Sequence, residues 1–155
     1  MPLQKPGKSK QDYGTPLEFV RALEKRLGIV GFSIDLAATQ DNSIAPQFYS
    51  EEFDALKEPW FRGTGWAFCN PPYGGIESWV KKAHHEAINY GAQIAMLLPA
   101  SVGSNWWAEW VHNTAHVLFV RPRLTFVGAE DPYPKDLVVL LYGPIFGGYD
   151  VWRWK

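Results

Sequence analysis

The feature that most constrains this chain is an apolar segment that ends abruptly in two prolines. Residues 66–69 read Trp-Ala-Phe-Cys, which predicts a buried strand, and Asn70-Pro71-Pro72-Tyr73 follows at once. Two consecutive prolines remove two backbone donors and fix two φ angles, so the hydrogen-bonded ladder cannot continue past this point. Pro71 also holds Asn70 in an extended conformation. The side chain of Asn70 and the nearby carbonyl groups are therefore expected just beyond the strand tip, where open parallel sheets bind ligands.

The composition predicts one globular domain. The chain has 155 residues, of which 46% are hydrophobic and 20% charged. This length suffices to bury a core but is short for two domains. The polar segment 1–11, which carries three lysines, is expected to be a flexible tail, so that the domain comprises residues 12–155.

Charge and cysteine content limit the classes of function. A net charge of −1 argues against general coating of nucleic acid and leaves phosphate binding to local basic clusters. The single cysteine excludes a disulfide framework and a cysteine-based metal site. We expect no metal site at His84 and His85 either, because adjacent helical residues point about 100° apart. Since the sequence contains neither an apolar run of about 18 residues nor a signal-peptide core, a soluble cytoplasmic protein without membrane contact is expected.

Alternating strand and helix patterns predict a three-layer α/β fold with a mostly parallel sheet. A helix is expected to begin at a capping box formed by Thr15, Pro16 and Glu18, and to end at Gly28. The expected strands cover residues 32–39, 66–69, 92–100, 115–120 and 136–142, with helices after Gly75 and around Trp106 and Trp110. Because no helix separates Val120 from Leu137, an antiparallel edge strand is expected.

Further candidate residues for a site follow the other strands. The strand 32–39 ends in Asp35 and small residues including Ala37, and small residues let a cofactor approach the backbone closely. No G-x-G-x-x-G pattern is present, so a dinucleotide fingerprint is absent. Among the acids that follow residue 50, Asp54 is the best placed to accept from ribose hydroxyls, although a merely solvated loop acid is the alternative.

With these pieces in order, the chain resembles the small phage-type (Dam-like) DNA adenine methyltransferases, which are Asn-Pro-Pro-Tyr amino-methyltransferases. The resemblance rests on the tetrad at residues 70–73 together with the following weaker matches in the same order: Thr15-Pro16, Phe32 to Ala38, Asn42-Ser43, Asp54 to Trp60, Leu97 to Ala100, Trp106-Trp107 and Arg121 to Phe126. It implies a Rossmann-like methyltransferase sheet, S-adenosylmethionine as methyl donor and adenine in double-stranded DNA as acceptor, with the base flipped out of the duplex. In a phage setting, methylation would mask sites from host nucleases.

The resemblance also implies roles for individual residues. Asn70, Pro71, Pro72 and Tyr73 would be catalytic, with two oxygen acceptors aimed at the amino hydrogens and Tyr73 as a stacking face. The cofactor would be lined by Tyr13, Thr15, Pro16, Asp35, Ala37, Asp54 and Asn70. The substrate would lie near Tyr73, Arg123 and Phe126. Because the chain has no room for a separate recognition domain, the loops 100–107 and 121–135 would read DNA, or a second subunit in a homodimer would help, or specificity is low.

Two alternatives remain open. The same chemistry could act on a cytosine amine, on RNA or on a protein glutamine, although Asn at the first position of the tetrad favours adenine or glutamine. A catalytically silent nucleic-acid-binding protein could also retain the fold. Such a protein would not need the tetrad, so substitution of Asn70 would leave its binding unchanged.

Overall fold

The structure is a computed structural model that describes residues 14–60, 63–144 and 147–155. The predicted tail 1–11 and the candidate residue Tyr13 lie outside this range. The described helices are α1 (Leu17–Leu27), α2 (Ile76–Tyr90) and α3 (Asn105–Trp110), with a 3-10 turn η2 (Tyr73–Gly75) before α2. The described strands are β1 (Ile34–Asp35), β2 (Gln47–Phe48), β3 (Trp66–Cys69), β4 (Gln93–Pro99), β5 (His116–Arg121), β6 (Leu137–Tyr142) and β7 (Tyr149–Arg153).

In the described part of the chain, the strands form a single sheet in the order β2-β1-β3-β4-β6-β5-β7. All neighbouring pairs are parallel except the two pairs made by β6. The predicted mostly parallel sheet with an antiparallel strand is therefore confirmed. The position predicted for that strand is wrong, because β6 lies between β4 and β5 and β7 forms the edge. The segment 122–136, which contains no helix, returns the chain so that β6 runs antiparallel directly beside β5.

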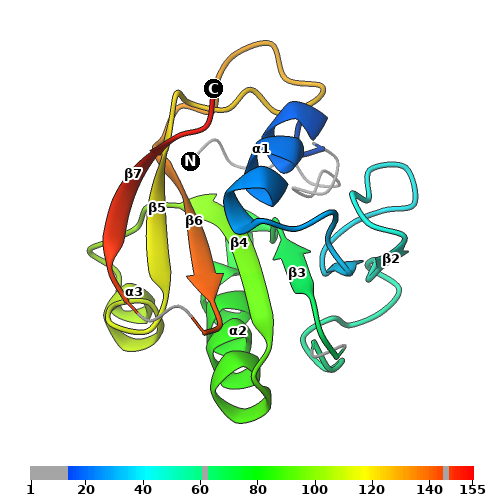
Figure 1. Cartoon of the computed structure of the whole chain (residues 1–155), viewed down its shortest axis with the longest axis vertical. Helices are drawn as coiled ribbons and strands as arrows, with labels where there is room; N and C mark the ends of the chain where they lie inside the picture. Colours follow the sequence, from blue (N-terminus) through cyan, green and yellow to red (C-terminus); the bar gives the residue numbers. More distant parts are fainter. Residues whose placement is uncertain (1–13, 61–62, 145–146) are drawn as a thin grey trace.

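Helices cover both faces of the sheet (Figure 1). α1 crosses one face, and α2 and α3 lie together against the other. Every residue of β6 is buried, as is every residue of β4 except Gln93, as expected for strands covered on both faces. On the α1 side, the ring of Phe19 packs against Trp152 and Trp154, with centroid distances of 5.4 and 5.2 Å.

Two strands differ from the sequence expectation in extent. The strand predicted at residues 32–39 is reduced to Ile34–Asp35, although Leu36 still donates a backbone hydrogen bond to Phe68 at 2.8 Å. A short strand, β2, lies in the segment 41–50, outside the strands expected from the sequence. Both strands are only two residues long, so neither produces a periodic pattern that sequence analysis can detect.

The start of α1 corrects a further prediction. Pro16 is the N-cap residue, its carbonyl accepts from Val20 at 3.1 Å, and no side chain caps the helix. The capping box is therefore absent, and the carboxylate of Glu18 lies 3.5 Å from the amino group of Lys155 instead. The hydroxyl of Thr15 is occupied elsewhere, as described below. Gly28, with a φ of 69°, ends the helix as predicted. None of the helices in the described ranges has the length and apolar character needed to cross a bilayer.

Candidate functional site

The sheet has a topological switch point between β1 and β3. From β1 the chain moves outward to β2, whereas from β3 it moves in the opposite direction to β4. β1 and β3 are parallel neighbours, with Asp35 level with Phe68. Ligands of open parallel sheets bind where neighbouring strands diverge in this way, beyond their carboxyl ends. By this rule, the segment after Asp35 and the segment from Asn70 onward flank the expected ligand crevice.

Asn70 presents a buried acceptor at this crevice. The residue is 6% exposed, and its Nδ2 donates to the Oγ1 of Thr15 at 3.3 Å. Its Oδ1 is buried and has no hydrogen-bond donor among the described residues. An unsatisfied buried acceptor typically costs about 1–3 kcal/mol. Thr15 fixes the orientation of the amide, so that this oxygen fits a ligand group that donates a hydrogen bond, such as an amine.

The two prolines and Tyr73 complete a rigid corner. Pro71 is buried, and Tyr73 opens the 3-10 turn with only 6% of its surface exposed. The Tyr73 ring stands edge-on to Tyr133 at a centroid distance of 5.6 Å. Burial, with a smaller contribution from Tyr133, raises the pKa of the Tyr73 hydroxyl well above its ordinary value. The ring therefore stays neutral and serves as an apolar surface and hydrogen-bond donor rather than as a base.

Asp35 organises the loop on the other side of the crevice. Its two carboxylate oxygens accept from the backbone amides of Ala37 and Ile44 at 3.3 and 3.1 Å. The residue is 3% exposed. Burial is the largest effect on this carboxyl and raises its pKa from 3.8 to about 7, against the opposing effect of the two amides. Asp35 thus holds residues 37–44 in place, and a direct contact between Asp35 and a cofactor stays a prediction.

This raised pKa predicts a pH dependence of stability. Asp35 binds its proton more tightly in the folded state than in the unfolded chain. The stabilisation that this proton binding gives is therefore complete below about pH 4 and is lost as the pH rises to about 7. Asp35→Asn removes the titration and keeps one acceptor oxygen. The free energy of unfolding of the variant, measured by urea denaturation, should therefore vary less between these pH values than that of the wild type.

The matched control is Asp54→Asn, which changes an exposed carboxylate. It should preserve the wild-type dependence of stability on pH. An unchanged slope in the Asp35→Asn variant would show that another group is responsible.

Other residues predicted for the site are less closely gathered. The carboxylate of Asp54 accepts from Leu56 at 3.2 Å and lies 3.8 Å from Lys57, so its contacts are within its own loop. The guanidinium of Arg123 is half exposed and lies 3.3 Å from the carboxylate of Asp136. Phe126 is 3% exposed and stands edge-on to Tyr133 at 5.8 Å. A position of Phe126 close to a substrate stays a prediction.

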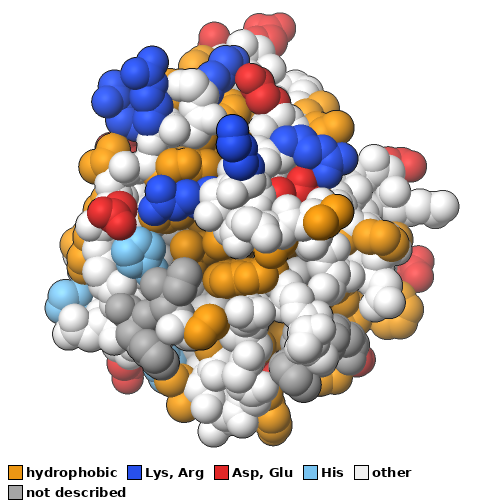
Figure 2. Space-filling view, in the orientation of Figure 1, with side chains coloured by type: hydrophobic (Ala, Val, Ile, Leu, Met, Phe, Trp, Pro, Cys, Tyr) orange, Lys and Arg blue, Asp and Glu red, His pale blue; other side chains and the backbone are white. Residues whose placement is uncertain are grey.

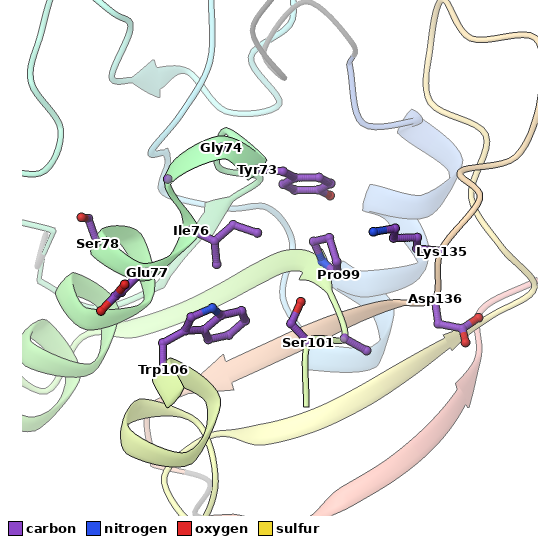
Figure 3. A pocket seen from close by; sticks show the side chains of 12 residues that line it. Tyr73, Gly74, Ile76, Glu77, Ser78, Pro99, Ser101, Trp106, Lys135 and Asp136 are labelled. Carbon is purple, nitrogen blue, oxygen red and sulfur yellow. The ribbon is translucent and has the colours of Figure 1, made fainter. Parts of the chain in front are cut away.

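A pocket of about 670 Å³ opens beside the corner, between the ends of β3 and β4 (Figure 3). Its lining comprises residues 73–78, residues 99–101, Trp106, Lys135 and Asp136. Gly74 and Gly75, which have no side chains, leave space here. The loops expected to read DNA contribute Ala100, Ser101, Trp106 and Lys135. Apart from Tyr73, sequence reasoning did not assign the other lining residues to the site. One of them, Pro99, ends β4, and parallel strands end at the same edge of a sheet, so its position next to the tetrad was a usable signal.

Comparison with known proteins adds two findings. A family model described as "DNA N-6-adenine-methyltransferase (Dam)" matches residues 4–137. This range contains every residue that we predicted for the site. A similar protein, the DNA N-6-adenine-methyltransferase of Escherichia phage T1, is 35% identical over 113 residues, which cover 73% of this chain and 46% of the relative. The chain thus spans about half the length of this curated relative.

Proposed function

Because the chain belongs to the DNA N-6-adenine-methyltransferase (Dam) family, we propose that it transfers a methyl group from S-adenosylmethionine to the exocyclic amino group of adenine in DNA. The observation that supports this proposal most directly is the buried Oδ1 of Asn70, which has no hydrogen-bond donor among the described residues. It lies at the carboxyl end of β3, on the corner between the switch-point crevice and the pocket. An amine donates the hydrogen bond that this oxygen lacks.

We also propose that the sheet is the Rossmann-like sheet of S-adenosylmethionine-dependent methyltransferases. Six strands run in one direction, β6 is reversed within the sheet, and helices lie on both faces. The crevice at the switch point then holds the cofactor. Thr15, Pro16, Asp35, Ala37 and Asn70 are the proposed lining, since Ala37 is small and the Oδ1 of Asn70 accepts from no donor in the described part of the chain. Tyr13 and Asp54 stay predictions.

The catalytic role of this chain would be to position an amine and to shift its electron density. S-adenosylmethionine, when bound, supplies an electrophilic methyl group on a positively charged sulfur. The lone pair of an adenine amino nitrogen is delocalised into the ring, which makes the group a poor nucleophile. The Oδ1 of Asn70 and the carbonyl of Pro71 would accept the two amino hydrogens and favour a pyramidal nitrogen. Pro71 and Pro72 hold both acceptors rigidly, and such fixed dipoles act without reorganisation during the reaction.

Double-stranded DNA is the proposed partner. An amino group inside a duplex cannot reach a pocket at a sheet edge, so the base would be flipped out. Figure 2 shows basic side chains gathered over the half of the molecule that holds α1 and the C-terminus. The exposed basic residues of α1 and of the C-terminal segment are Arg21, Lys25, Arg26, Arg153 and Lys155, and Arg121 and Arg123, at and after the end of β5, are exposed as well. We propose phosphate contacts here, whereas a homodimer and a cytoplasmic location stay predictions.

Incubation with methyl-labelled S-adenosylmethionine and separate DNA, RNA and protein acceptors tests the proposed function. We expect label in DNA, recovered as N6-methyladenine at a defined sequence. Label in cytosine, RNA or glutamine would replace adenine by another acceptor. Binding of DNA without any transfer, in a protein that still binds the cofactor, would favour a catalytically silent binder.

Thr15 provides a more specific test of the proposed site. Thr15→Val keeps the shape of the side chain but removes the hydroxyl that accepts from Asn70. A hydrogen bond of this kind contributes about 1 kcal/mol, so kcat for DNA methylation should fall about fivefold as the amide loses its orientation. Thr15→Ser should restore most of the rate. Equal rates in the valine variant and the wild type would remove Thr15 from the positioning of Asn70.

A further inference from the structure

We infer that Arg121 and Arg153 together hold one backbone phosphate of the substrate DNA, so that β7 adds a DNA-binding element to the fold. The inference deepens the proposed function, on which it rests, because it narrows the general phosphate contacts to one defined pair of side chains. β7 (Tyr149–Arg153) lies beyond residues 4–137, the part of the chain that the family model matches. Membership of the family therefore does not by itself predict this contact.

The two arginines stand side by side at the ends of neighbouring parallel strands. Arg121 is the last residue of β5, and its partner in the register is Arg153, the last residue of β7. The backbone amide of Trp154 donates to the carbonyl of Arg121 at 3.0 Å, which continues the pairing past both residues. Like charges directly opposite each other on neighbouring strands repel. An anion bound between the two guanidinium groups would remove this repulsion, and phosphate matches their geometry.

No acidic side chain in the described ranges neutralises this pair. Both arginines are exposed, and the guanidinium group of Arg121 has no ion pair or hydrogen bond within those ranges. Arg153 donates through Nε to the backbone oxygen of Lys155 at 3.2 Å, which leaves its two Nη groups available. The acids at positions 130 and 131, in the loop after β5, form no ion pair with either arginine. The pair therefore presents two positive charges to solvent.

The cations next to the pair are already neutralised. Arg123 lies 3.3 Å from the carboxylate of Asp136, and the amino group of Lys155 lies 3.5 Å from that of Glu18. Lys135, at the pocket, adds a single positive charge. The attraction for a phosphate is therefore strongest at the two arginines rather than evenly spread over the basic residues of this region.

The pair lies on the face of the sheet that α3 only partly covers. Side chains alternate along a strand, and Trp152, the neighbour of Arg153, packs against Phe19 of α1. Arg121 and Arg153 therefore point to the opposite face. There, α3 is six residues long and lies near the beginning of β7 (Figure 1), and Val151, closer to the end of the strand, is 69% exposed. A DNA backbone can thus reach both guanidinium groups.

The pair also lies at the edge of the sheet that holds Asn70. Because β6 is antiparallel to both β4 and β5, the strands β3, β4, β5 and β7 run in the same direction and their carboxyl ends share one edge. The strand order places β5 three spacings and β7 four spacings from β3, or about 14–19 Å. For a duplex along this edge, the phosphate is therefore expected about four to six base pairs from the flipped adenine.

Substitution of the arginines tests the inference once the methylated sequence is known. Arg121→Ala, Arg153→Ala and the double alanine variant remove the charges, whereas Arg121→Lys keeps one. Lys81→Ala is the matched control, because Lys81 is an exposed cation of α2 that lies over Trp110 and does not line the pocket. For each protein we would measure the Kd for a duplex with the target sequence at several salt concentrations, kcat and KM for DNA, and the Kd for S-adenosylmethionine.

The double variant should bind the duplex about tenfold more weakly than the wild type, with a matching rise in KM, because charge-assisted bonds to a phosphate are lost. The kcat and the cofactor Kd should be unchanged, since neither arginine touches the reacting atoms. The slope of log Kd against log salt should fall by about one, as for a single phosphate. A fall of about two would assign the arginines to separate phosphates and contradict the shared contact. Arg121→Lys should lose less affinity than Arg121→Ala, and Lys81→Ala should match the wild type.

A series of duplexes in which each phosphate in turn is replaced by an uncharged methylphosphonate locates the contact. One replacement, about four to six base pairs from the target adenine, should weaken binding by the wild type and leave binding by the double variant unchanged. If the wild type methylates DNA but the double variant binds the duplex equally well, or every replacement affects both proteins alike, the inference is wrong and the proposed function stands. If the wild type transfers no methyl group to DNA, both proposals fail together.

Discussion

Asn70→Ala is expected to lower kcat for DNA methylation by two or more orders of magnitude while leaving the Kd for S-adenosylmethionine within a few-fold of the wild-type value. The substitution removes the buried oxygen that has no donor among the described residues and that we propose accepts an amino hydrogen. A fixed hydrogen-bonding group at a reacting centre typically contributes about 3 kcal/mol to the transition state. Steady-state kinetics on the mapped DNA site and titration of the cofactor would measure the two quantities separately.

Asn89→Ala is the matched control for this prediction. Asn89 carries the same side chain, is exposed near the end of α2 and bonds only to His85 among the described residues. It should retain the wild-type rate. Asn70→Asp keeps an acceptor oxygen but loses the donor that reaches Thr15, so its rate should fall between those of the wild type and the alanine variant. A wild-type rate in Asn70→Ala would remove this residue from the catalytic step.

The central part of the site was predictable because its signals are local. A buried apolar run that stops at Asn-Pro-Pro fixes both a strand and its end within eight residues, residues 66–73. The fully buried character of β4 and β6 follows in the same way from continuous apolar runs. The antiparallel relation of β6 to β5 also followed from the missing helix between them. In each case one short segment carries all the information that the prediction needs.

Contacts between distant segments were not predictable in this way. Thr15-Pro16-Leu17-Glu18 has the composition of a capping box, yet Thr15 is hydrogen bonded to Asn70, which lies 55 positions away. β7 forms the edge of the sheet and was not among the strands expected from the sequence. The backbone hydrogen bond from Tyr133 to Leu124, at 2.7 Å, folds the loop after β5 so that the ring of Phe126 packs on Tyr133, a contact that the sequence did not predict. Which of several possible partners a side chain contacts is decided only when the whole fold is assembled.

Trp107→Ala should have the largest effect on stability of the substitutions considered. The side chain is 2% exposed, is among the largest fully buried side chains and makes a hydrogen bond to Tyr149. Truncation of a buried tryptophan leaves a cavity and typically costs about 3–5 kcal/mol. For a domain of this size, that loss corresponds to a fall in the melting temperature of about 10 °C. Urea denaturation and a thermal melt followed by circular dichroism would measure both.

Trp106→Ala is the control for this prediction, because it truncates the same side chain one position earlier on the same helix. Trp106 is half-buried at the pocket, so its loss should change the free energy of unfolding by about 1 kcal/mol or less. Trp107→Ala should thus lower the stability far more than Trp106→Ala does. Similar losses of stability in both would mean that α3 holds its two rings in equivalent packing, which would contradict the division between the buried and the pocket-facing tryptophan.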